Sequence, residues 1–253
     1  EITAPNSTSI YVNDPVEAVL NTDSVMCQGV PHDFLNGSTG GCPPSIVPTQ
    51  GPDAQSVYFH FDFGNCDTIS GNYTLPWPAV TYEYPQAGIY TAVLTAESHC
   101  GIDDDSLIIT VYPSPNVSFT APDVCEGQTT QFTSNSFAEI AGQRVDTCYD
   151  QNGNMILNTV QVPAGGAITG WYWDFGDPNS GTANNTSTLE DPIHEFSSCG
   201  SYTVTLTVTD DNNCSNYWSK TVEVFDLPEP IFTVDDVCSD TASTIENYSV
   251  PGS

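Results

Sequence analysis

Hydrophobic and polar residues alternate with a period of two along much of the chain. The clearest runs are residues 203–208 and 221–225, and strand-sized apolar runs occupy residues 91–96 and 107–112. Because successive side chains of a β-strand point to opposite faces, this period predicts strands that bury one face. Glycine, proline, asparagine and aspartate separate the runs, and none of them shows a helical period. The pattern therefore predicts an all-β fold of antiparallel β-sandwiches.

The same order of motifs occurs twice. Cys27 and Cys125 each follow a proline-marked linker, and each is followed first by an Asp-Phe-Gly or similar turn and then by a Gly-x-Tyr strand. Cys125 lies 98 positions after Cys27, and a third such cysteine, Cys238, lies 113 positions further on. Each interval has the size of one small β domain, so the chain is expected to be a slice of a tandem array.

The repeats predict four segments. They are residues 1–13, the last strand of a preceding domain; residues 14–113, domain one; residues 114–227, domain two, with an inserted hairpin at about 138–169; and residues 228–253, the first strands of a third domain. The linkers between them are short and carry proline, which predicts a semi-rigid array.

The insertion in domain two has two readings. Residues 150–154, Asp-Gln-Asn-Gly-Asn, are similar to half of a calcium loop, but no glutamate stands at the closing position. Asn152-Gly153 between the alternating runs 145–149 and 155–162 instead favours a tight hairpin turn. The hairpin is the preferred interpretation.

Charge excludes whole classes of partner. The chain has 32 acidic residues against two basic ones, Arg144 and Lys220, for a net charge of −30. Such a field repels nucleic acid and anionic membrane surfaces. No apolar run approaches the roughly 18 residues of a spanning helix, and the chain opens without a targeting peptide, so no membrane span is expected in this segment.

Nine cysteines indicate an oxidising, extracellular compartment. No Cys-x-x-Cys pair is present, so disulfide bonds are favoured over a zinc site.

Repeat two resembles the PKD (polycystic kidney disease) domain family. The resemblance is carried by residues 171–177, Trp-Tyr-Trp-Asp-Phe-Gly-Asp, then by His194-Glu195-Phe196, and then by residues 200–210. Repeat one departs from this pattern, since Phe61 replaces Trp173. The cysteine motif is similar to that of PKD repeats in giant Bacteroidota surface proteins exported by the type IX system. The resemblance implies tandem Ig-like sandwiches with an architectural or adhesive role at the cell surface, attached to the outer membrane.

The motif residues are expected to be structural. They are Trp173, Asp174, Phe175 and Gly176 in repeat two, Asp62, Phe63 and Gly64 in repeat one, and the tyrosine-corner residues Tyr90 and Tyr202. Asp62 and Asp174 could act as catalytic acids, but a side chain bonding the turn N–H groups is the favoured reading. The four histidines lack any nucleophile signature, so no catalytic residue and no enzyme activity is predicted.

Two low-specificity binding sites are predicted. Asp103, Asp104, Asp105, Asp210 and Asp211 are candidate calcium ligands, because carboxylates suit Ca²⁺ and the chain has almost no cations of its own. The alternative is a solvated acidic face, so no cofactor is required. Trp77, in a proline-stiffened loop, is either an exposed sugar-stacking platform or interface anchor, or a loop aromatic that folds back on the sandwich.

Repeat equivalence predicts the disulfide pairing. Cys27 should bond Cys100, and Cys125 should bond Cys214, because each pair joins the repeat opening to the last hairpin. Domain-specific bonds are expected at Cys42–Cys66 and Cys148–Cys199. The partner of Cys238 is then expected in the remainder of the third domain.

These observations predict a rod, stalk or filament segment that mediates attachment, gliding or contact with other cells. The expected partners are further domains of the same chain, a homo-oligomeric filament, and a cell-surface glycan or protein ligand. The alternative is an accessory carbohydrate-binding module of a secreted hydrolase, contacting polysaccharide through Trp77 and strand aromatics.

Overall fold

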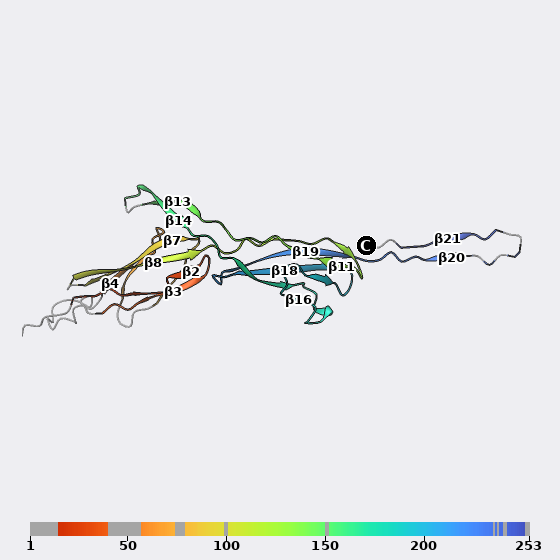
Figure 1. The fold of residues 1–253 in the computed structure, drawn as a ribbon, viewed down its shortest axis with the longest axis horizontal. Helices are drawn as coiled ribbons and strands as arrows, with labels where there is room; N and C mark the ends of the chain where they lie inside the picture. The colour runs from red at the N-terminus through yellow and green to blue at the C-terminus, as the bar shows by residue number, and fades with distance from the viewer. Residues whose placement is uncertain are drawn as a thin grey trace, which may run out of the picture. The chain divides into compact units, whose positions relative to one another are not determined.

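The computed structural model describes residues 15–39, 57–73, 79–98, 101–149, 152–234, 236, 238–239 and 242–250. These residues form β-strands and their connections, with one short 3-10 turn at Pro178–Ser180 (Figure 1). The chain divides into two compact units: unit one is Glu1–Pro113 with Ile140–Ala164, and unit two is Ser114–Glu139 with Gly165–Ser253. Among the described residues, no helix has the length and hydropathy to cross a bilayer.

Unit one is a sandwich of a five-stranded sheet, ordered β2-β8-β7-β4-β5, and a three-stranded sheet, ordered β1-β3-β6. The strands are β1 (Leu20–Asn21), β2 (Val25–Cys27), β3 (Pro31–Asn36), β4 (Val57–Asp62), β5 (Thr68–Tyr73), β6 (Val80–Glu83), β7 (Gly88–Ser98) and β8 (Gly101–Tyr112). All pairs are antiparallel except β2 and β8, which run parallel with Cys27 opposite Tyr112.

Unit two repeats this order. Its five-stranded sheet is β10-β19-β18-β15-β16, faced by the pairs β11–β17 and β12–β9. The strands are β9 (Phe119–Thr120), β10 (Val124–Cys125), β11 (Thr129–Gln131), β12 (Thr133–Ser134), β15 (Ile168–Asp174), β16 (Thr186–Ser187), β17 (Ile193–Glu195), β18 (Gly200–Asp210) and β19 (Ser215–Phe225). β10 again runs parallel to the last strand, with Cys125 opposite Phe225. Beyond them, β20 (Phe232–Val234) pairs with β21 (Ile245–Asn247).

Alternation along the strands builds one aromatic core in each unit. Phe59 and Phe61 of β4 point inward with Leu94 of β7, and all three are buried. In unit two, Trp173 of β15 and Leu206 of β18 face each other in register and are fully buried. The predicted all-β sandwich fold is confirmed.

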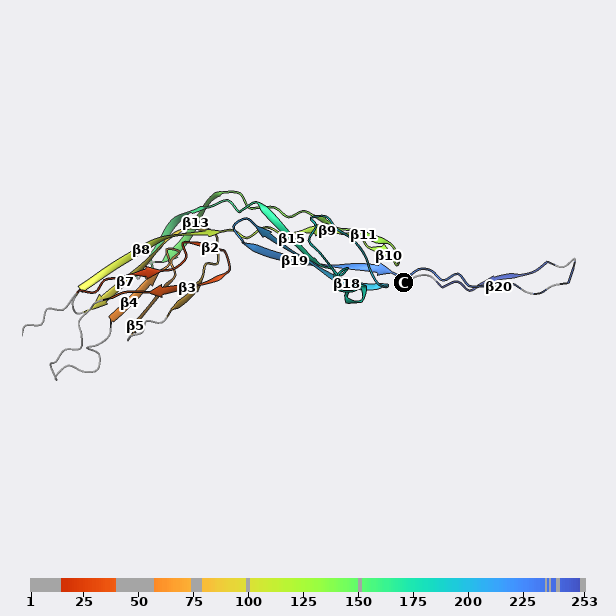
Figure 2. The same cartoon turned by 60° about the horizontal axis from the view of Figure 1, so that its bottom comes forward.

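The hairpin inserted in repeat two packs on unit one. Its strands, β13 (Gly142–Tyr149) and β14 (Met155–Val162), pair in register as the sequence predicts. Figures 1 and 2 draw them beside the sheet that contains β7 and β8. Val160 is buried in the core of unit one. Residues 140–164 therefore interrupt the sequence of repeat two but belong structurally to its neighbour.

Candidate functional site

The Asp-Phe-Gly turns have the same geometry in both units. Asp174 Oδ1 accepts a hydrogen bond from Gly176 N at 3.0 Å, and Asp62 Oδ1 accepts one from Gly64 N at 2.8 Å. Gly176 has a φ of 68°, and a Cβ there would lie 2.4 Å from the Thr203 carbonyl oxygen, so only glycine fits. Both aspartates thus stabilise a turn, which is the role that the motif predicts.

A tyrosine corner lies near the start of β7 in unit one and of β18 in unit two. Tyr90 Oη donates to Gln86 O, and Tyr202 Oη donates to Ser198 O, both at 2.8 Å. Each bond ties a strand start to the preceding loop, as in other Ig-like sandwiches.

A buried charged network lies behind the turn of unit two. The Asp177 side chain is fully buried and accepts from Ser197 N at 2.8 Å and from Ser197 Oγ at 2.5 Å. His194 Nε2 lies 3.3 Å from Asp177 Oδ2. Burial alone would raise the pKa of Asp177, but the Ser197 and His194 hydrogen bonds outweigh it and lower that pKa. Burial lowers the pKa of His194 below its usual value.

This Ser-Asp-His group is not arranged for nucleophilic catalysis. In a catalytic triad the histidine lies between serine and carboxylate, whereas here Ser197 Oγ bonds the carboxylate directly. The carboxylate is inaccessible to a substrate. The network instead holds two loops together, and the sequence motif pointed to Asp177 and His194 only as structural positions.

The hairpin is fixed to unit one by a disulfide and by Arg144. Cys66 bonds Cys148, with a Cα–Cα distance of 5.7 Å. Arg144 forms a bidentate ion pair with Asp146, and its Nη1 donates to Ala87 O at 2.6 Å. The Arg144 Nη2 donates to Tyr90 Oη at 2.7 Å. One of the two cations of the chain therefore fastens the hairpin to the tyrosine corner.

A polar cleft lies where the hairpin meets unit one. Its volume is 370 Å³, and Asn65, Asp67, Gln86, Tyr90 and Arg144 contribute to its lining. Arg144 is the one cationic residue of this lining, and each of its three nitrogens already donates to a protein acceptor.

The predicted calcium ligands are engaged with the backbone. Asp103 Oδ2 accepts from Ala18 N and Asp105 Oδ2 from Leu20 N, both at 2.8 Å, which ties β1 and the segment just before it to β8. Asp210 is buried and accepts from Gly166 N at 3.0 Å and Cys214 N at 2.8 Å. Asp104 and Asp211 are exposed. Calcium binding at these residues stays a prediction.

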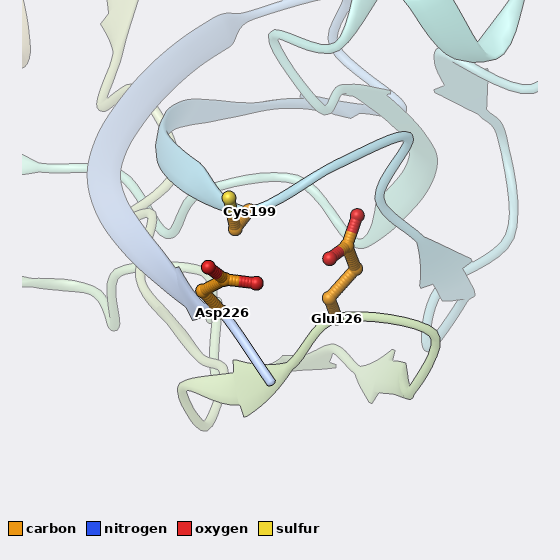
Figure 3. A group of neighbouring side chains, drawn as sticks. All are labelled: Glu126, Cys199 and Asp226. Atoms are coloured by element: carbon orange, nitrogen blue, oxygen red, sulfur yellow. The ribbon is translucent and has the colours of Figure 1, made fainter. Parts of the chain in front are cut away.

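A different group of metal-type ligands lies at one end of unit two. Glu126, Cys199 and Asp226 bring one ligand atom each within 4.8 Å of one another, and this is the one such group among the described residues (Figure 3). Glu126 follows β10, Cys199 precedes β18 and Asp226 follows β19, so the strand order brings them together. We call these three residues and Cys125 the Cys125 end. The sequence analysis missed it because the group depends on the parallel pairing of β10 with β19.

Several disulfide predictions were wrong. Cys66 bonds Cys148, so neither Cys42–Cys66 nor Cys148–Cys199 forms. Cys125 and Cys199 carry free, exposed thiols, whereas Cys214 is disulfide-bonded, so Cys125–Cys214 does not form either.

Register explains the error in repeat two. Cys125 lies opposite Phe225, the last residue of β19, whereas Cys214 precedes its first residue. A strand of 11 residues separates these ends by about 33 Å. In unit one Cys27, which is disulfide-bonded, lies opposite the last residue of β8. Cys42, Cys100 and Trp77 lie outside the described residues.

A comparison with protein families finds a match in repeat two. Residues 138–225 match the profile of the PKD domain family. A stretch of 66 residues is 39% identical to the pre-pro-metalloprotease PrtV of Vibrio cholerae serotype O1, and it covers 26% of this chain but only 6% of that protein.

Solved structures align weakly. The PKD1 domain of Vibrio anguillarum Epp aligns at 23% identity with a TM-score of 0.28, over 44% of this chain and 93% of that domain. Titin domains I67–I69 align at 14% identity with a TM-score of 0.30, over 94% of this chain and 76% of that one. The strand order described above is the firmer evidence for the fold. Together with the family match, it shows that residues 138–225 are similar to a PKD domain, within a chain of Ig-like β-sandwiches.

Proposed function

We propose that this chain is a non-catalytic structural segment of an extracellular protein, in which tandem sandwich units act as a spacer that bears load. The observation that carries the proposal is the hairpin. Residues 140–164 leave unit two, pack on unit one and are bonded to it through Cys66 and Cys148. The chain therefore passes between the two units three times, after residues 113, 139 and 164.

Force spectroscopy on the chain held by its two ends tests this function. Each unit should unfold in a discrete step, because the hydrogen bonds between the strands of a sandwich break together when the chain is pulled. Cys66 and Cys148 are 82 positions apart, and the bond hides that length from extension. Reduction should then add at least about 300 Å of extended chain, since the bonds of Cys27 and Cys214 open as well. Smooth extension without discrete steps would remove the load-bearing role.

The finer proposal is a long surface adhesin or filament that mediates attachment, gliding or cell contact. The tandem repeats, the disulfides and the net charge of −30 support it. Antibodies against this chain should label intact cells in extended structures. Label confined to the culture supernatant would contradict surface attachment.

A second candidate, carbohydrate binding, is favoured by two exposed tyrosines. Tyr172 and Tyr217 are paired in register with Thr207, one on each side, and are 51% and 68% exposed. They stand two strands apart, about 10 Å, on a face rich in Ser and Thr hydroxyls. Aromatic faces at such spacing stack on sugar rings of an extended polysaccharide.

Co-sedimentation with insoluble cellulose and chitin tests this second candidate. Y172A/Y217A should abolish retention, and Y149A, which removes an equally exposed tyrosine of the hairpin, is the matched control. Equal retention of both variants would exclude carbohydrate binding at the face that carries Tyr172 and Tyr217.

A further inference from the structure

The Cys125 end of unit two corresponds to the end of unit one that the hairpin covers. Cys27 and Cys125 occupy the same register position, each opposite the last residue of the closing strand. The next residue repeats the match, since Gln28 N donates to Tyr112 O and Glu126 N donates to Phe225 O, both at 2.9 Å. In the sequence, Cys199 stands where repeat one has Ala87.

In unit one this end is occupied and covalently closed. Arg144 donates to the Ala87 carbonyl, Cys66 bonds Cys148, and Cys27 is itself disulfide-bonded. The segment that covers it, residues 140–164, comes from the repeat that follows in the sequence. The architecture therefore already contains one case of a repeat that closes the end of its predecessor.

In unit two the corresponding side chains are exposed. Cys125 and Cys199 carry free thiols, and Phe225 and Leu227 are 44% and 54% exposed. The two thiols are not placed to bond each other. Val124 and Gly200 both pair with Val224, so the strands that carry the cysteines lie about 9.6 Å apart, beyond the roughly 7 Å that a disulfide tolerates.

We propose that the Cys125 end is a docking surface for the domain that follows in the same chain, closed by a disulfide between Cys125 and a cysteine of that domain. The inference rests on the proposed function as a tandem segment. β19 runs directly into residues 226–250, which contain the third cysteine motif at Cys238 and which the repeat pattern predicts to be the start of a following domain.

The chemistry of the surface specifies the docking segment. Glu126 and Asp226 form an acidic pair beside Cys199, which favours a segment that brings a cation, as the hairpin brings Arg144 to unit one. Formation of the bond releases two protons and two electrons from the two thiols. A disulfide-bearing oxidant of the oxidising compartment accepts them and is reduced to its dithiol.

Thiol mapping of the intact natural protein tests the inference. N-ethylmaleimide is added before denaturation, and Asp-N and Glu-C peptides are compared with and without reduction, because trypsin has only two sites in this chain. Cys125 should escape labelling and appear, before reduction, cross-linked to a cysteine beyond residue 253. In the isolated 253-residue chain both Cys125 and Cys199 should be labelled, and Cys199 is the matched internal control.

Three results would overturn the proposal: labelling of Cys125 in the intact protein, a Cys125–Cys199 bond, or a disulfide-linked dimer through Cys125. Any of these, with discrete unfolding steps retained under force, would remove the docking surface and leave the structural function standing.

Discussion

The two units place different side chains at equivalent positions of one scaffold. In unit two, Phe175 stacks on His194 with ring centroids 4.2 Å apart, and His194 faces the buried carboxylate of Asp177. In unit one, Phe63 stacks on Tyr82 at 3.8 Å. The aromatic stack is thus kept while an ionisable imidazole is exchanged for a phenol.

The polar partner of the stack changes with it. Asn65 replaces Asp177, and its Nδ2 donates to Tyr82 Oη at 2.6 Å, while Tyr82 Oη donates to Asp67. Unit one then adds a covalent brace, the Cys66–Cys148 bond, at the same turn. One unit holds its loops with a buried charged network and the other with a disulfide. The fold thus sets where loops must be held, and acid and loss of the Cys66–Cys148 bond should each destabilise a different unit.

Removal of the brace should have the largest effect. C66A/C148A should lower the free energy of unfolding of unit one by about 4–5 kcal/mol, because the bond closes a loop of 82 positions. Unit two should be unchanged in a two-step denaturant titration followed by tryptophan and tyrosine fluorescence. C125A/C199A, which removes two free thiols, is the matched control and should alter neither step. An equal loss in both units would break the comparison.

Substitution of the buried carboxylate of Asp177 should have the second-largest effect on stability. D177N presents an amide N–H to the Ser197 donors, so unit two should lose about 2 kcal/mol. D174N is the control, since its Oδ1 can still accept from Gly176 N at an exposed turn. Chemical denaturation of both variants checks the order, and a larger loss for D174N would show that the network contributes little.

A lower pH should destabilise unit two more than unit one. The pKa of His194 is lowered by burial, so the unfolded imidazole takes up a proton more readily, and unit two loses stability as the pH falls below about 6.5. The pKa of Asp177 is lowered too, so a second loss follows below about 4, as its carboxyl becomes protonated.

Denaturation midpoints at pH 7.5, 5.5 and 3.5 measure these two losses. H194Q should remove the step between pH 7.5 and 5.5. Unit one, with Tyr82 and Asn65 at the matching places, is the internal reference. A parallel shift of its midpoint in the first interval would contradict this assignment.

Local sequence patterns predict most of the fold. The alternation along β18, the Asp-Phe-Gly turn and the Asn-Gly hairpin each depend on residues close in sequence, and the structure contains all three. The parallel pairing of β2 and β10 with the closing strands leaves no such local trace. Without this parallel pairing, repeat equivalence predicts a bond from Cys125 to Cys214, which lies at the opposite end of the sheet.

Local sequence pattern also does not predict which surface the hairpin packs on. Asn152-Gly153 predicts the turn but says nothing about which surface the strands cover. Two signals were available in Arg144, one of two cations in an acidic chain, and Cys148, which has no counterpart in repeat one. A lone cation and an unmatched cysteine on one hairpin mark it as a segment that binds elsewhere, but their partners Ala87 and Cys66 come only from the three-dimensional arrangement.

The smallest effect separates the two tyrosine corners. Y202F removes one hydrogen bond to a backbone carbonyl, the bond to Ser198 O, and should cost about 1 kcal/mol. Y90F removes the matching bond to Gln86 O and also the acceptor of Arg144 Nη2, so it should cost about 1.5 kcal/mol or more. The excess should vanish in an R144M background, because Arg144 then no longer couples the corner to the hairpin. A double-mutant cycle by chemical denaturation measures this coupling. If Y90F and Y202F cost the same in the native background, the hairpin adds nothing to the corner, and the two corners do not contribute to the difference between the units.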